Sequence, residues 1–108
     1  MYNNAWMEKM KNKVCFYLTE NEGKTVNSDL CKTFSLKPST VRAIVNYARS
    51  QGEPICSDRE GYFYSTDPTH IRATIEHLES RIAKQQEAVD GMKRLLVQED
   101  KTHENVSE

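Results

Sequence analysis

Residues 39–65, STVRAIVNYARSQGEPICSDREGYFYS, combine a helical pattern, a glycine and two short β-like runs in one uninterrupted stretch. In the first half, the apolar residues recur at the spacing of one helix face: Val41, Ile44, Val45 and Ala48. Gly52 follows this pattern and is a typical helix stop. We therefore expect a helix over about residues 39–51 that turns its apolar stripe toward a core.

The opposite face of this helix has a different chemistry. At 100° per residue, the positions facing away from the stripe or flanking it are small, polar or basic: Ser39, Thr40, Arg42, Ala43, Asn46, Tyr47, Arg49 and Ser50. Small side chains let a helix approach another surface closely, and arginine and asparagine supply hydrogen-bond donors.

The second half of the stretch predicts a β-hairpin. Residues 54–57 and 62–65 bracket a four-residue turn, 58–61, in which Gly61 takes a position that needs unusual dihedral angles. Arg59 lies at the tip between Asp58 and Glu60, so the tip is net negative.

Two more helices are predicted upstream. Residues 4–19 have one apolar stripe, with Lys9, Lys11 and Lys13 away from it and a stop near Gly23. The residues of that stripe are Trp6, Met10, Val14, Tyr17 and Leu18.

A short extended pair at residues 25–26 then precedes a helix that Asn27 or Ser28 caps and that runs to about Phe34. Its inward residues are expected to be Leu30, Cys31 and Phe34. Pro38 fits the first turn of the following helix, where its missing N–H leaves no hydrogen bond unmade.

The C-terminal segment has the pattern of a coiled coil. Asp67 and Pro68 form a strong helix start. The seam positions then follow at spacings of four and three without a slip: Ile71, Ile75, Leu78, Ile82, Gln85, Val89, Met92 and Leu96. We expect a dimerisation helix over residues 67–98 and a disordered, polar tail over 99–108.

A single helix of this length cannot bury its whole seam on a domain of residues 1–66. The N-terminal half of the seam could pack on the first helix of the same chain, but the half from Ile82 onward requires a partner, most simply a second copy. Gln85 is a polar core residue, which fixes register or partner number at some cost in stability. The flanking pairs, Thr74 with Glu79 and Arg81 with Gln86, leave parallel and antiparallel pairing open.

Composition narrows the class of protein. The chain has 108 residues, is 37% hydrophobic and 29% charged, and has a formal charge of −1. Residues 1–65 carry nine Lys/Arg and seven Asp/Glu, whereas residues 66–108 carry six and nine, so the basic surplus lies with the helix and hairpin. No apolar run could span a bilayer and the N-terminus resembles no secretion signal, so we expect a cytoplasmic protein. The three widely spaced cysteines, 15, 31 and 56, favour reduced structural thiols over a disulfide or a zinc site.

The segment VNSDLCKTFSLKPSTVRAIVNYARSQGEPICSDREGYFYS resembles the winged helix-turn-helix family of DNA-binding domains. The resemblance extends over residues 5–65. Its most telling part is ARSQGEPICSDREGYFYS, which is similar to the corresponding stretch of small phage and bacterial regulators and, more loosely, to the DNA-binding domain of biotin repressors.

The resemblance implies a mainly α protein with a small hairpin, in which the helix at 39–51 reads the major groove of double-stranded DNA. Base contacts would come from Ser39, Thr40, Arg42, Ala43 and Asn46. Phosphate contacts would come from Lys37, Tyr47 and Arg49, and Arg59 would reach the backbone or a minor groove. The implied role is a homodimeric transcriptional or phage-type regulator. A winged-helix adaptor that binds a replication or transcription factor is the alternative.

Other chemistry is not indicated. The sequence contains no catalytic Ser/His/Asp arrangement, paired carboxylates or phosphate loop, so we expect no enzyme activity, cofactor or metal. His70 and His77 fall on one helix face, where an exposed position is favoured over a metal site. Residues 62–64 could form a stacking platform for single strands, but strand alternation favours burial of Phe63 or of its two neighbours.

Overall fold

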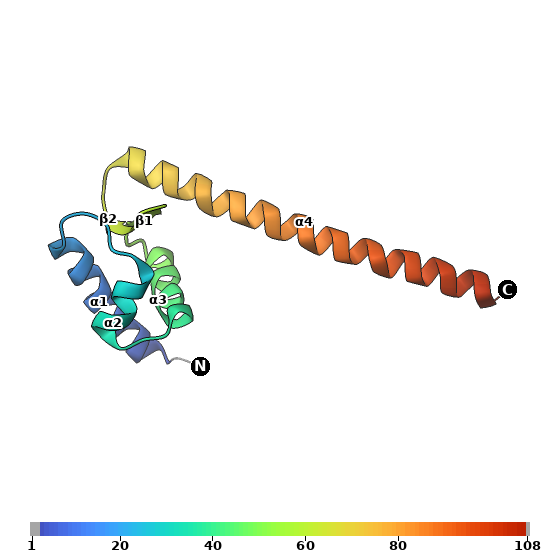
Figure 1. The fold of residues 1–108 in the computed structure, drawn as a ribbon, viewed down its shortest axis with the longest axis horizontal. Helices are drawn as coiled ribbons and strands as arrows, with labels where there is room; N and C mark the ends of the chain where they lie inside the picture. Colours follow the sequence, from blue (N-terminus) through green and yellow to red (C-terminus); the bar gives the residue numbers. More distant parts are fainter. Residues whose placement is uncertain (1–2, 108) are drawn as a thin grey trace. The chain divides into compact units, whose positions relative to one another are not determined.

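The computed structural model describes residues 3–107, with side chains described for residues 3–97. It is mainly helical (72%) with one two-stranded antiparallel hairpin, which confirms the predicted composition of the fold. The elements, labelled in Figure 1, are α1 (Asn4–Glu20), α2 (Asn27–Phe34), α3 (Pro38–Ser50), β1 (Ile55–Asp58), β2 (Gly61–Tyr64) and α4 (Pro68–Ser107). The chain divides into two compact units, 1–74 and 75–108, whereas the sequence analysis expects a boundary at residue 66.

The core of the first unit lies where α1, α2 and α3 pack together with the hairpin. The predicted stripe of α3 is fully enclosed, since Val41, Ile44, Val45 and Ala48 are 0–1% exposed. Leu30 from α2 is equally enclosed, and Cys31 and Phe34 are half-buried beside it. This burial confirms the predicted inward face of both helices.

Helix α1 buries a wider face than its stripe predicts. Met10, Val14 and Leu18 are buried as expected, but Met7 and Lys11 are buried too. Lys11 thus lies off the predicted stripe and is nevertheless buried. Its ammonium group forms an ion pair with Glu8 one turn earlier, at 2.5 Å, which balances the buried charge.

The segment between α1 and α2 pairs with the hairpin. Thr25 forms an antiparallel bridge with Tyr62, with backbone N–H groups donating to the opposite carbonyl in both directions at 2.8 Å. The predicted extended pair at residues 25–26 is therefore present as this bridge. Helix α2 is capped by Val26 without a side-chain hydrogen bond, so the prediction of an Asn27 or Ser28 cap is wrong. Asn27 instead donates to the carbonyl of Pro38 at 3.4 Å.

The hairpin is tighter than predicted. Asp58 pairs with Gly61, so both belong to the strands and the loop contains only residues 59 and 60 rather than four residues. Gly61 has a φ of +135°, and a Cβ atom there would lie 2.6 Å from the carbonyl oxygen of Thr25. Glycine is needed because the bridge strand approaches so closely at this point.

Helix α4 begins as the sequence predicts. The Asp67 side chain accepts a hydrogen bond from the backbone N–H of Thr69 at 2.9 Å, and Pro68 is the first helical residue. The buried Thr74 hydroxyl accepts from the backbone N–H of Ser57 at 3.2 Å, which attaches the start of α4 to β1. The helix continues to Ser107, through most of the expected 99–108 tail.

All three cysteines carry free thiols. Cys56 is buried, whereas Cys15 and Cys31 are half-buried. Burial is the main cause that raises the pKa of the Cys15 thiol to about 11, so this group stays protonated at neutral pH. In the part of the chain that the structure describes, no helix is both long and apolar enough to cross a membrane.

Candidate nucleic-acid interface

One face of α3 is exposed along its N-terminal half. Ser39, Arg42 and Asn46 are all exposed and lie opposite the buried stripe, and Lys37 is exposed just before the helix. Ala43, in the middle of this face, is half-buried and adds no bulk. The polar side chains of Arg42 and Asn46 therefore project from a helix face that is otherwise small, which is a shape that fits a groove.

Thr40 does not belong to this face. It is 6% exposed, and its backbone N–H donates to the carbonyl of Lys37 in the first turn of α3. Thr40 is predicted to contact a base, but burial leaves its side chain without access to a ligand.

Tyr47 is engaged within the first unit rather than standing free for a phosphate. Its hydroxyl donates to a carboxylate oxygen of Glu8 at 2.7 Å, and the other oxygen of Glu8 binds Lys11. Hydrogen bonds from Lys11 and then Tyr47 hold the pKa of the Glu8 carboxyl below its usual range. The same contact raises the pKa of Tyr47. This triad joins α1 to α3 at the edge of the core.

Arg49 fixes α3 to the hairpin. Its Nε donates to the carbonyl oxygen of Ile55 at 2.7 Å, and its Nη2 donates to Oγ of Ser57 at 3.1 Å. The guanidinium group also lies over the Tyr62 ring, 5.9 Å from its centroid. Arg49, expected to contact phosphate, thus occupies the outer edge of β1, where backbone groups would otherwise be unpaired.

The tip of the hairpin has a partner that the sequence analysis missed. Lys24 forms ion pairs with Asp58 and, at 3.4 Å, with Glu60. It also lies 5.1 Å above the Phe63 ring. Adding Lys24 to Asp58, Arg59 and Glu60 brings the formal charge of the tip from −1 to zero, and Arg59 remains exposed. A long-range backbone pairing, Thr25 with Tyr62, brings Lys24 to this position, so spacing along the sequence alone could not reveal it.

These ion pairs shift the protonation of the tip. The hydrogen bond from Lys24, followed by backbone N–H donors of the tip itself, holds the pKa of the Asp58 carboxyl below its usual range. The bond to Asp58 in turn raises the pKa of Lys24. Both groups are therefore firmly charged at neutral pH.

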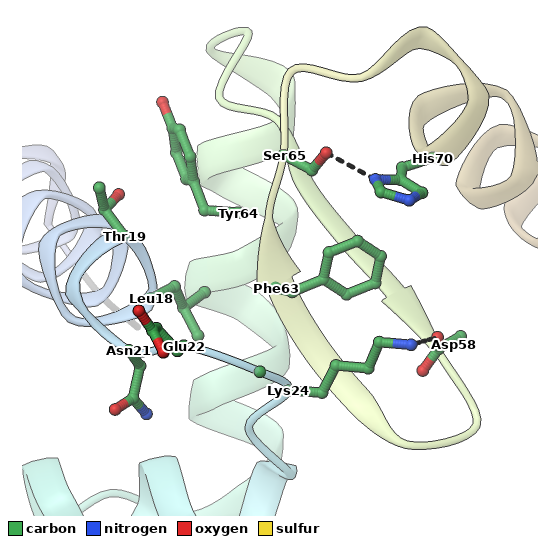
Figure 2. Close-up of a pocket in the computed structure, with 11 residues that line it drawn as sticks. Leu18, Thr19, Asn21, Glu22, Lys24, Asp58, Phe63, Tyr64, Ser65 and His70 are labelled. Atoms are coloured by element: carbon green, nitrogen blue, oxygen red, sulfur yellow. Dashed lines mark hydrogen bonds and ion pairs between the residues drawn. The ribbon is translucent and has the colours of Figure 1, made fainter.

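The aromatic run of β2 is divided between two faces. Tyr62 and Tyr64 pack against the core, and the Tyr64 hydroxyl donates to Glu53 at 2.8 Å, which raises its pKa to about 12. Phe63 points into an open hollow of about 440 Å³ beside Lys24, Ser65 and His70 (Figure 2). Its ring contacts His70 edge-on at 5.3 Å, and His70 Nδ1 lies 2.7 Å from the Ser65 hydroxyl. The predicted alternation is thus confirmed with the two tyrosines on the core side.

Within residues 3–97, no three His, Cys, Asp or Glu side chains come together in a group that could hold a metal ion. His70 instead contacts the Phe63 ring and the Ser65 hydroxyl.

The seam of α4 is largely uncovered. Ile71 and Leu78 are half-buried, Gln85 is exposed, and Ile75, Ile82, Val89, Met92 and Leu96 are 44–67% exposed. Leu95 and Val97 are exposed as well, so the apolar face is wider near residue 96 than the seam predicts. Exposed apolar patches of this kind are typical of surfaces that bind another protein or a second copy of the same chain.

Comparison with known proteins gives no relative: no family model matches the chain, and neither a curated protein nor a solved structure is significantly similar to it.

Proposed function

We propose that this chain is a dimeric, double-stranded DNA-binding protein whose first unit acts as a winged helix-turn-helix domain. In this proposal α2 crosses the DNA backbone, α3 enters the major groove, the hairpin is the wing, and α4 pairs two copies. The role that fits best is a small transcriptional or phage-type regulator.

The observation that carries the proposal is the division of α3 into two faces. Its stripe is 0–1% exposed, while Arg42 and Asn46 project from the opposite side on a helix that is held rigidly at its far end. Arg42 has the geometry to offer two hydrogen bonds to guanine and Asn46 to adenine. Rigid support matters because a reading helix must hold these side chains in register with the bases.

The contacts within the first unit refine the set of DNA-binding residues. Lys37, Ser39, Arg42, Ala43, Asn46 and Arg59 remain available for DNA. Tyr47 and Arg49 become positioning residues, because their polar groups bind α1 and β1. Lys24 removes the net negative charge that would oppose a wing contact by Arg59.

A domain with so few phosphate contacts binds weakly by itself. Joining two such domains makes the second contact intramolecular, which raises the overall affinity without any new contact. The exposed seam of α4 supplies a means of joining them.

The test is selection of duplexes from a random pool with the full chain, followed by fluorescence anisotropy at about 50 mM salt. Arg42→Ala should weaken binding to the selected duplex by about five- to 150-fold, the usual value of a bidentate base contact. Arg94→Ala is the matched control, because it removes the same side chain from an exposed position on the outer face of α4.

Failure to bind any duplex more tightly than about 100 µM would end the proposal, because that is weaker than ordinary non-specific affinity. In that case the same α3 face would be assigned to a protein partner, as in the adaptor alternative, and Arg42→Ala would weaken that complex instead.

A further inference from the structure

The residues that flank the seam of α4 indicate whether two copies would pair parallel or antiparallel. Taking the seam as the core of a heptad, Glu79, Gln86 and Lys93 lie along one side of it, and all are exposed. Arg81, Ala88 and Leu95 lie along the other side and are exposed as well. In a two-stranded coiled coil these flanking residues meet across the interface and set the direction of pairing.

We propose that two copies of α4 pair antiparallel, in the register that places Gln85 of one copy opposite Val89 of the other. This inference rests on the self-association within the proposed function, but it does not depend on DNA binding. The apolar contacts of this register are Leu78 with Leu96 and Ile82 with Met92 of the second copy, each formed twice.

Charge complementarity selects this register. In an antiparallel pair, flanking residues on the same side of the seam meet each other. Glu79 of each copy therefore lies beside Lys93 of the other copy, which makes two such contacts. Gln86 lies beside Gln86 of the second copy. A parallel pair would place Glu79 beside Thr74, Arg81 beside Gln86 and Lys93 beside Ala88, which yields no opposite-charge contact. Sliding the antiparallel pair by one heptad in either direction breaks both Glu79–Lys93 contacts, and one of the two directions also brings Arg72 against Lys93.

The widened apolar face near residue 96 fits the same arrangement. A hollow of about 440 Å³ runs along α4 beside Ala88, Met92 and Leu95. In the proposed register Ile82 of the second copy faces Met92 and lies against this hollow, while the aliphatic stem of Arg81 covers Leu95. Ala88 lies beside Ala88 of the second copy at the two-fold axis, where a small side chain allows the helices to approach closely.

The pairing has a consequence for the DNA-binding units. Position 74, where the first unit ends, lies opposite position 100 of the second copy. The two copies of position 74 are then about 26 residues apart along the axis, or about 39 Å at 1.5 Å per residue. An antiparallel pair therefore attaches the two DNA-binding units at points that lie apart along the paired helices, whereas a parallel pair would attach them side by side.

A charge-reversal cycle on the full chain tests the pairing by sedimentation equilibrium. Glu79→Lys should weaken the dimer by about ten-fold, because two attractive contacts become repulsive. Lys93→Glu should do the same, and the double variant should return to within about two-fold of the original chain. Glu87→Lys, the same charge change on the outer face, is the matched control and should have no effect. Additive effects in the double variant would overturn the proposal.

Disulfide trapping gives an independent result. Chains with Gln85→Cys and Val89→Cys, one of them carrying a tag that changes its size, are mixed and oxidised, with the original chain as the control for Cys15, Cys31 and Cys56. Antiparallel pairing predicts mostly the mixed disulfide, whereas parallel pairing joins each variant to itself. Trapping of like chains would overturn the pairing and leave dimerisation and DNA binding intact. A chain that stays monomeric would overturn both the pairing and the dimer, and anisotropy would still report DNA binding separately.

Discussion

The apolar stripes of α3 and α4 have similar sequence patterns and opposite environments. The four stripe residues of α3 are 0–1% exposed within the first unit, whereas five of the eight seam residues of α4 are 44–67% exposed. A helical pattern therefore specifies which face must be buried but not what buries it. In α3 the partner lies in the same chain, and for α4 we propose a second chain.

Truncation of a stripe residue provides the largest test of this difference. Ile44→Ala should lower the free energy of unfolding of the first unit by about 2–5 kcal/mol, because it leaves a cavity in an enclosed core. Ile82→Ala removes the same atoms from α4. It should leave the unfolding of the first unit unchanged and weaken only self-association.

The measurement is thermal or urea unfolding followed at several protein concentrations. If Ile82→Ala lowers stability by an amount that does not depend on protein concentration, the seam is covered by its own chain. That result would contradict the proposed difference between α3 and α4.

Gly61→Ala should have the next largest effect. The added Cβ would lie 2.6 Å from the Thr25 carbonyl oxygen, at a φ of +135° that other residues rarely adopt. We expect a loss of about 2 kcal/mol or more in unfolding free energy, since the bridge between the hairpin and residue 25 must shift. Gly23→Ala is the control, because it also has a positive φ of 90° but has open space around it. Equal losses in the two variants would show that backbone strain matters and the close approach does not.

Arg49 and Arg42 extend the comparison to the two ends of α3. Arg49→Ala removes two hydrogen bonds to β1 and should cost about 1–2 kcal/mol in unfolding free energy. Arg42→Ala should change stability by less than about 0.5 kcal/mol, because its side chain is exposed. Urea unfolding monitored by circular dichroism would separate the two. A similar stability loss from both would contradict the assignment of Arg42 to ligand contact and Arg49 to support.

What the sequence predicts well is set by local periodicity. Spacing and residue type predict the order of the elements and the inward faces of α2 and α3. They also predict the start of α4 at Asp67 and Pro68 and the unusual dihedral angles of Gly61. The outcome at Lys11 shows the limit of this reasoning. Lys11 lies off the apolar stripe, and the periodicity alone does not show that a wider face of α1 and the nearby Glu8 allow its burial.

The candidate site is less predictable because its polar side chains are shared with distant elements. Tyr47 and Arg49 look available on a helical wheel, but Glu8 is 39 residues away from Tyr47 and Ser57 belongs to a later strand. Lys24 meets Asp58 across 34 residues for the same reason. Residue type and spacing along the sequence do not reveal such tertiary contacts. Fewer α3 side chains are therefore available for a ligand than the sequence predicts.

The ion pair of Lys24 with Asp58 provides the smallest test, through its pH dependence. The pKa of the Asp58 carboxyl is lower in the folded chain than in the unfolded chain. Its contribution to stability is therefore present above the unfolded pKa and is lost as the pH falls through the folded value. Lys24→Met should remove most of this acid-dependent part, so the variant should lose less stability than the original chain between neutral pH and the acid side of the carboxylate range. Lys13→Met, at an exposed position of α1, should keep the original pH profile.

Thermal unfolding across that pH range measures both variants, and the outcome bears on function as well as on stability. If Lys24→Met also weakens DNA binding while Lys13→Met does not, then the hairpin tip contributes to the proposed interface, because without Lys24 its acidic side chains repel phosphate. If DNA binding is unchanged although the pH profile flattens, Lys24 acts only within the first unit, and contact with DNA is limited to α3. The first outcome would extend the binding surface from one helix to two elements that are joined through the backbone pairing of Thr25 with Tyr62.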